Sequence, residues 1–285
     1  SMEYSVWLCR WTKEDFFMED SLPSSPDRSI HRSIPHYDER MAPDPNALIP
    51  YDLHELDKVT GGIRPGQLVV VTSDPGAGKT TLLLQFLRSA IRQGHPVHLV
   101  SLEMSEADIR QRLFSGEAEV TLQSLDTGEG REPLSDLSAA AAMFPGAMLD
   151  LEVRGDLELM DFLMLTEDKG DRILAIDCVD LVDPDYVGGN GRTLGGISRR
   201  LKKYALESGW PVVVTARHHK KFLSKSPLMA EADVVIKLDR PDAAVLDHER
   251  SGEADIHVVK NRMGPIASFT VMHQLHYSKF RSLTS

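Results

Sequence analysis

The feature that most constrains this chain is a glycine-rich loop that follows a short β-branched run and opens an amphipathic helical pattern. The order strand, loop, Gly-Lys-Thr-Thr and helix is typical of a phosphate-binding loop, with Ser73 where the pattern usually has its first glycine. Gly76 and Gly78 let backbone N–H groups turn inward around an anion, and the helix N-terminus adds partial positive charge. We therefore predict that nucleotide phosphates bind Ser73, Asp74, Pro75, Gly76, Ala77, Gly78, Lys79, Thr80 and Thr81.

Strand and helix patterns alternate from residue 53 onward, which predicts an α/β fold with a mostly parallel sheet flanked by helices. Short apolar runs typical of buried strands lie at 68–72, 97–102, 172–177, 212–215 and 234–236. Helices are predicted over 79–93, from Ser105 onward and over 193–208. The residues from 256 to 273 predict a C-terminal β-hairpin that turns near 263–265.

Two carboxylates follow predicted strands at the edge of the sheet where the loop lies. Asp177 ends an apolar strand, so with the Thr80 hydroxyl it is the candidate ligand for Mg²⁺. Glu103 follows the strand at 97–102, where a carboxylate can accept the proton of an attacking water. A turn aspartate and a surface glutamate are the alternatives for these residues. Lys79 is expected to reach the β- and γ-phosphates of ATP.

Composition limits the class of protein and the surroundings in which it works. Two cysteines in 285 residues form no disulfide framework, and the N-terminus has no signal-peptide pattern, so we expect a cytoplasmic protein. No apolar run is long enough to span a membrane. The net charge of −11 argues against a surface that binds nucleic acid everywhere, so such contacts require a local basic patch or an oligomer.

The first 48 residues differ in composition from the rest of the chain. Apolar residues between 6 and 18 suggest a short helix, either packed on its own domain or docked on a neighbouring subunit. Five prolines lie between residues 21 and 48, which predicts a linker or an extended arm. We therefore divide the chain into residues 1–48, a short helix with a proline-rich arm, and residues 49–285, an ATPase domain.

Several motifs together resemble the motor domain of DnaB-type replicative helicases. They are Thr60-Gly61-Gly62-Ile63-Arg64-Pro65-Gly66, Ser101-Leu102-Glu103-Met104-Ser105, Arg192-Thr193-Leu194 and Lys260-Asn261-Arg262-Met263-Gly264-Pro265. The resemblance runs from about residue 53 to the C-terminus and implies a RecA-like ATPase fold. It implies that Glu103 is the catalytic base and that Lys260 and Arg262 reach a neighbour's active site as a finger. It also implies ATP and Mg²⁺ as cofactors and a homo-oligomer in the form of a hexameric ring.

The chain departs from the family pattern at three positions. Where the family carries a glutamine that senses γ-phosphate, this sequence has Arg217. Cys178 and Asp180 replace the usual tyrosine and glutamine after the acid of the metal site. The N-terminal helical domain of the family is also absent from the sequence, so we expect a ring to need DNA, nucleotide or a partner in order to form.

The resemblance places DNA-contacting loops after two of the core strands. Residues 183–191 are glycine-rich and acidic, whereas the second segment is basic and predicts phosphate contacts from Arg217, His218, Lys220, Lys221 and Lys225. A solvated surface loop is the alternative for this cluster. No set of ligands beside His218 and His219 suggests a metal other than Mg²⁺.

These observations predict an ATP-dependent DNA motor that binds single-stranded DNA and works with replication or recombination proteins. One alternative is a RadA- or KaiC-like recombination or regulatory ATPase, although the zinc motif of the RadA type is missing. A second alternative is a nucleotide-binding adaptor of a replicative helicase that hydrolyses ATP weakly, which the acidic net charge and Arg217 favour.

Overall fold

The computed structural model of the chain describes residues 48–127, 134–155, 157, 159–165, 172–182, 194–217, 227–243 and 248–283. The predicted N-terminal helix and arm lie outside these residues, except for residue 48. So do the segment 183–191 and the basic cluster that follows Arg217. No helix in the described part of the chain is both long and apolar enough to cross a membrane.

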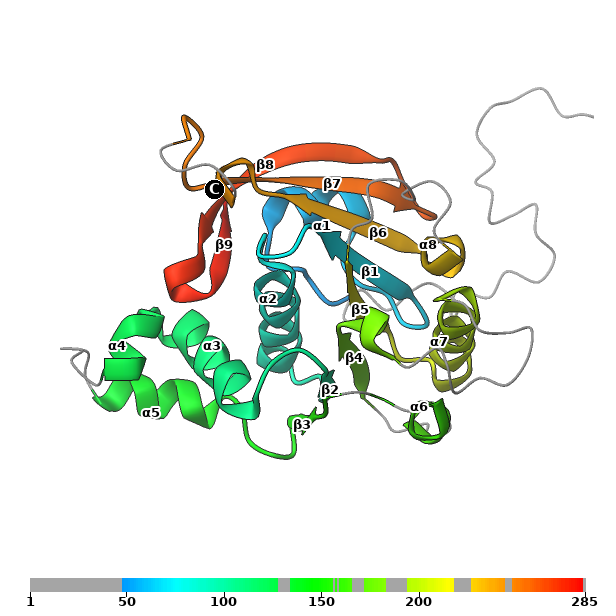
Figure 1. The fold of residues 1–285 in the computed structure, drawn as a ribbon, viewed down its shortest axis with the longest axis horizontal. Coiled ribbons are helices and arrows are strands. Elements are labelled where there is room, and N and C mark those ends of the chain that lie inside the picture. Colours follow the sequence, from blue (N-terminus) through cyan, green and yellow to red (C-terminus); the bar gives the residue numbers. More distant parts are fainter. Residues whose placement is uncertain are drawn as a thin grey trace, which may run out of the picture. The chain divides into compact units, whose positions relative to one another are not determined.

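The described strands form one mixed sheet in the order β3-β2-β4-β5-β1-β6-β7-β8-β9 (Figure 1). The first six of these in the sheet run parallel, and β6 to β9 pair antiparallel. Their bounds are β1 Leu68–Ser73, β2 Val97–Ser101, β3 Leu149–Val153, β4 Ile173–Asp177, β5 Val212–Arg217, β6 Val234–Asp239, β7 Glu253–Asn261, β8 Ala267–Gln274 and β9 Lys279–Ser282.

Helices cover the parallel part of the sheet on both sides, with α2 and α3 on one side and α7 on the other (Figure 1). The helices are α1 His54–Thr60, α2 Lys79–Arg92, α3 Glu106–Ala118, α4 Leu122–Thr127, α5 Leu134–Ala142, α6 Leu159–Leu165, α7 Leu194–Ser208 and α8 Pro227–Glu231. Short 3₁₀ turns lie at η5 Val179–Leu181, η6 Pro241–Ala243 and η7 Leu275–Tyr277.

The central strand β1 shows why two layers of helices are needed. Val69 and Val71 belong to one buried cluster with the apolar face of α2, whereas Leu68 and Val70 belong to a second cluster with α7. Every residue of β1 is buried, so the strand has no solvent face. Burial of both faces of β1 explains why its sequence is a continuous apolar run.

The predicted fold class is confirmed, with a mostly parallel sheet between helices and an antiparallel C-terminal extension. The predicted strands and helices are present, with ends that differ by up to three residues. Ser105 caps α3 by accepting the N–H of Asp108 at 3.2 Å, as its position three residues before an acid suggested. The predicted hairpin is the β7–β8 pair. The sequence analysis missed the two outermost strands, β3 and β9, and the helices α1, α4, α5, α6 and α8.

Candidate nucleotide-binding site

The glycine-rich loop joins the end of β1 to the first residue of α2, as predicted. Gly76 has a φ of 77° and Gly78 a φ of 109°, which is the region where glycine is favoured. At Gly78 a Cβ atom would also lie 3.0 Å from the ring of Phe280, so a side chain there has little room. Lys79 is the first residue of α2, and only 6% of its surface is exposed.

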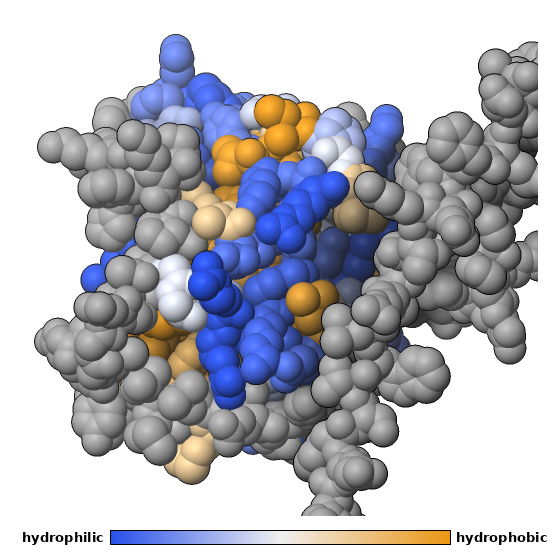
Figure 2. Space-filling model, turned by 90° about the vertical axis from the view of Figure 1, so that its right-hand side faces the viewer, coloured by the Kyte–Doolittle hydropathy of each residue, from blue (hydrophilic) through white to orange (hydrophobic). Residues whose placement is uncertain are grey.

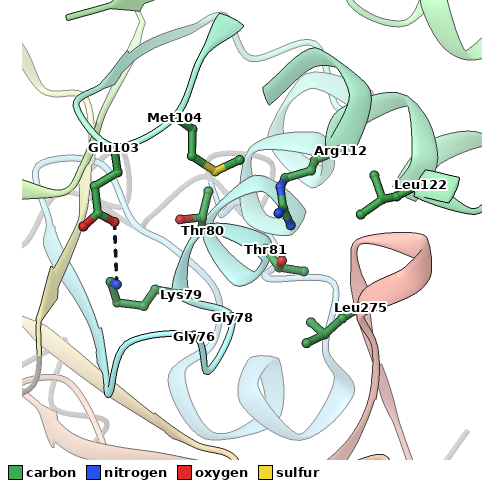
Figure 3. A pocket seen from close by; sticks show the side chains of 10 residues that line it. All are labelled: Gly76, Gly78, Lys79, Thr80, Thr81, Glu103, Met104, Arg112, Leu122 and Leu275. Atoms are coloured by element: carbon green, nitrogen blue, oxygen red, sulfur yellow. Dashed lines mark ion pairs between the residues drawn. The ribbon is translucent and has the colours of Figure 1, made fainter. Parts of the chain in front are cut away.

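A cavity of about 320 Å³ lies against this loop at the start of α2 (Figure 3). The predicted residues Lys79, Thr80 and Glu103 line it together. Met104, Arg112, Leu122 and Leu275 complete the lining, and the sequence analysis assigned no role to any of them. Met104 lies in the turn between β2 and α3. Arg112 on α3, Leu122 on α4 and Leu275 in η7 reach the cavity only because the chain folds over α2, so no local spacing in the sequence marks them.

Thr80 and Asp177 form the candidate metal-binding pair. The Thr80 hydroxyl donates to Asp177 Oδ2 at 2.9 Å, and the Thr215 hydroxyl donates to Oδ1 at 2.5 Å. Burial raises the pKa of Asp177, and the hydrogen bonds from Thr215 and Thr80 oppose that rise. A carboxylate and a hydroxyl held beside a phosphate loop are the oxygen ligands that Mg²⁺ prefers, so these residues fit the metal.

Glu103 lies between two cations above the loop. Its Oε2 atom is 3.8 Å from Lys79 Nζ (Figure 3). Its Oε1 atom accepts hydrogen bonds from Arg217 Nη2 at 2.7 Å and from Arg217 Nε at 3.2 Å. β2 and β4 are paired with Ser101 opposite Asp177, which brings both predicted carboxylates to one edge of the sheet.

Arg217, which was predicted to contact DNA, is the last residue of β5 and lies beside the loop. Its side chain forms an ion pair with Glu103. In the parallel pairing of β1 and β5 it lies opposite Ser73, the first residue of the loop. Its main-chain N–H donates to Asp180 Oδ2 at 2.6 Å. The role in DNA binding stays a prediction, and so do the roles of His218, Lys220, Lys221 and Lys225, which lie outside the described residues.

The predicted finger residues lie at the end of the sheet remote from β3 and β2, where β7 turns into β8. Lys260 Nζ donates to the carbonyls of Met229 and Ala230 in α8, at 2.9 and 2.8 Å. Arg262 Nη1 lies 3.3 Å from Asp233 Oδ1. Within this chain the two cations therefore contact α8 and the residues just after it, and neither lines the cavity at the loop.

The side of the molecule that carries these cations also exposes apolar side chains. Figure 1 places α7, α8 and the β7–β8 turn on this side, and Figure 2 shows apolar patches there among polar surface. Met263 and Ile266 of the turn are 67% and 68% exposed, and Leu206 of α7 is 65% exposed. A surface of this kind is compatible with contacts to another protein chain.

Comparisons with known proteins agree with this geometry. The family described as "DnaB-like helicase C terminal domain" matches residues 49–282. The replicative DNA helicase DnaB of Leifsonia xyli is 31% identical over 255 residues, which cover 82% of this chain and 56% of that protein. The chain thus spans about half the length of this relative.

Two solved structures share the fold. One is an ATPase domain, which superimposes with a TM-score of 0.72 at 22% identity, and the match covers 82% of this chain and 91% of that domain. A DnaB-like replicative helicase, solved in a study of its interactions with primase, gives the same TM-score and identity over 82% of this chain and 62% of its own. At these identities the likeness shows a common RecA-like ATPase fold.

Proposed function

We propose that this chain, which belongs to the family of DnaB-like helicase C-terminal domains, is an ATP-hydrolysing motor that acts on single-stranded DNA. The observation that carries the proposal is the meeting of Lys79, Thr80 and Glu103 around one cavity, with Asp177 hydrogen-bonded to Thr80. A phosphate loop, a metal-side acid and a general base are the three parts that hydrolysis of a nucleoside triphosphate requires.

Each of these residues has a definite role in the proposed reaction. The inward N–H groups of the loop and the Lys79 ammonium would bind the β- and γ-phosphates. Thr80 and Asp177 would hold Mg²⁺, which would neutralise charge that develops on the phosphates. Glu103 would accept a proton from the water that attacks the γ-phosphorus. The relative positions of Lys79 and Glu103 support this, because their charged groups lie 3.8 Å apart in the lining of the same cavity (Figure 3).

The second half of the site would come from a neighbouring subunit in a homo-oligomer, proposed to be a hexameric ring. Lys260 and Arg262 lie on the exposed side that carries the β7–β8 turn, away from their own cavity. A guanidinium from the next subunit would stabilise charge on the transferred phosphoryl group. The isolated subunit should then hydrolyse ATP slowly.

The proposed binding of DNA rests on the sequence, and the proposed protein partner rests on a related helicase. His218, Lys220, Lys221 and Lys225 form a basic cluster in an otherwise acidic chain, which suits a DNA strand in the channel of a ring. A related helicase has been solved in a study of its interactions with primase, so a replication protein is the kind of partner we propose. We place the protein in the cytoplasm.

The test is steady-state ATP hydrolysis with and without single-stranded DNA, for the unchanged chain and for Lys79→Ala and Arg262→Ala. DNA-stimulated hydrolysis that both substitutions abolish would support a motor with a finger supplied between subunits. If Lys79→Ala abolishes nucleotide binding and Arg262→Ala has no effect on hydrolysis, the proposed finger is wrong.

Two observations favour a second candidate function, that of a nucleotide-binding adaptor with weak turnover. Glu103 is already held by Arg217, and the net charge of −11 is unusual for a protein that tracks DNA. The same assay separates the two functions. An adaptor would bind ADP and ATP normally and show no stimulation of hydrolysis by DNA at any concentration.

A further inference from the structure

We propose that Arg217 is a positioning residue that acts through Glu103, holding the general base in place and offsetting its charge. This inference rests on the proposed function, because it takes Glu103 as the base. It assigns to Arg217 a role inside the nucleotide site of its own subunit.

The geometry of the pair gives the guanidinium control over the direction of the carboxylate. Arg217 places two donors, Nη2 and Nε, on the single atom Oε1, at 2.7 and 3.2 Å. The other oxygen, Oε2, is left toward the loop, 3.8 Å from Lys79 Nζ. A planar fork bound to one oxygen restrains rotation of the carboxylate, so the second oxygen stays over the place where the γ-phosphate and its water would lie.

The charges explain why a base at this position needs a cation of its own. A base must be ionised to accept a proton, yet here it would face the negative charges of a bound triphosphate. Lys79 would turn to the phosphates when ATP binds, so it would no longer serve Glu103. Arg217 remains beside the carboxylate, and its contact with Glu103 offsets the repulsion from the phosphates.

Arg217 is itself fixed by neighbours that follow the metal-side acid. Its main-chain N–H donates to Asp180 Oδ2 at 2.6 Å, and the thiol of Cys178 donates to the same oxygen at 3.1 Å. The three positions where this sequence departs from the family pattern thus form one connected group that ends on Glu103.

The test compares kcat and KM for ATP in four versions of the whole chain, without DNA. Arg217→Ala should lower kcat about fivefold and leave KM within about twofold, as expected for loss of a partly exposed charge pair that acts on the chemical step. Arg217→Lys keeps the charge and loses the fork, so it should restore part of kcat. Arg281→Ala is the matched control, because Arg281 makes a similar pair with Glu119 and is 49% exposed, against 44% for Arg217.

A double variant shows whether the effect passes through the base. Glu103→Gln should reduce kcat strongly, and adding Arg217→Ala should then change it by less than about twofold. Equal losses in both backgrounds would overturn the inference, as would an Arg217→Ala chain with unchanged kcat and weaker DNA binding. An unchanged chain that binds ADP and hydrolyses no ATP would overturn the proposed function and this inference with it.

Discussion

Gly116 in α3 lies directly over the guanidinium of Arg88, and this contact allows a sharp test of the packing. Arg88 is 2% exposed, and its Nη1 atom donates to the carbonyl of Ser278 at 3.2 Å. A Cβ atom at position 116 would lie 2.2 Å from Nη1 and 2.3 Å from Cζ, well inside van der Waals contact. We therefore expect Gly116→Ala to displace the guanidinium.

Two opposing effects set the size of the change. Alanine is more favourable than glycine within a helix by about 1 kcal/mol, which alone would stabilise the chain. Overpacking a buried contact has an unfavourable effect of about 1–3 kcal/mol. Displacing a buried donor from its carbonyl adds a further loss of about 1–3 kcal/mol. The clash outweighs the helix preference, and Gly116→Ala should lower the free energy of unfolding by about 2 kcal/mol.

Urea unfolding followed by circular dichroism measures this difference, and a second background tests its cause. In an Arg88→Ala chain the guanidinium is gone, so the step from Gly116 to alanine should become neutral or stabilising by up to about 1 kcal/mol. A Gly116→Ala chain that is more stable than the unchanged protein would refute the packing of Arg88 beneath α3. Equal losses in both backgrounds would refute the clash as the cause.

Three further predictions concern buried groups. Burial raises the pKa of Asp57 to about 6. The contribution of Asp57 to the free energy of unfolding is therefore full below about pH 4 and is lost as the pH rises through 6. Asp57→Asn should remove this part of the change in urea midpoint that is measured between pH 4 and pH 7. Because burial raises the pKa of Cys178 to about 12, its thiol in a Cys9→Ser chain should react with a thiol reagent at pH 8 only after unfolding, and rapid reaction of the folded chain would contradict its burial. Lys202→Met removes the nearer of the two cations that pair with Asp233, whose side chain is 9% exposed, and leaves only the half-exposed Arg262 at 3.3 Å. It should lower the free energy of unfolding by about 2 kcal/mol, and an unchanged urea midpoint would show that the Lys202 pair contributes little.

Local patterns in the sequence predicted the parts of the fold whose burial is simple. β1 and β4 are buried along their whole length, so their composition alone marked them as strands. The edge strand β3 alternates Leu, Asp, Leu, Glu and Val and ends with Val153 at 40% exposure, a weaker signal that a surface segment could also give. β9 has four residues, and its place beside β8 depends on the turn at η7.

In the candidate site, too, some residues could be predicted from the sequence and others could not. The loop, Asp177 and Glu103 could be placed because parallel strands bring their carboxyl ends to one edge of the sheet. The direction of the Arg217 side chain could not be predicted, because the sequence does not tell whether an arginine at a strand end turns to solvent or to a carboxylate 114 residues away. The lining residue Arg112 was missed because its place in the cavity depends on how α3 packs over α2.

The contacts of Arg262 within its own chain do not oppose the finger role that we propose for it. Asp233 also accepts the Leu68 N–H at 2.8 Å and the Lys202 ammonium at 2.6 Å, so it keeps a cation when Arg262 leaves. The Arg262 pair is 3.3 Å long, and the arginine side chain is 45% exposed, so losing the pair costs at most about 1 kcal/mol. A charge-assisted hydrogen bond to a phosphate contributes about 1.5–3 kcal/mol, and a guanidinium can make two of them. Arg262 would therefore bind the nucleotide of a neighbouring subunit more strongly than it binds Asp233. Before that nucleotide is present, the contact with Asp233 would keep the guanidinium near the β7–β8 turn.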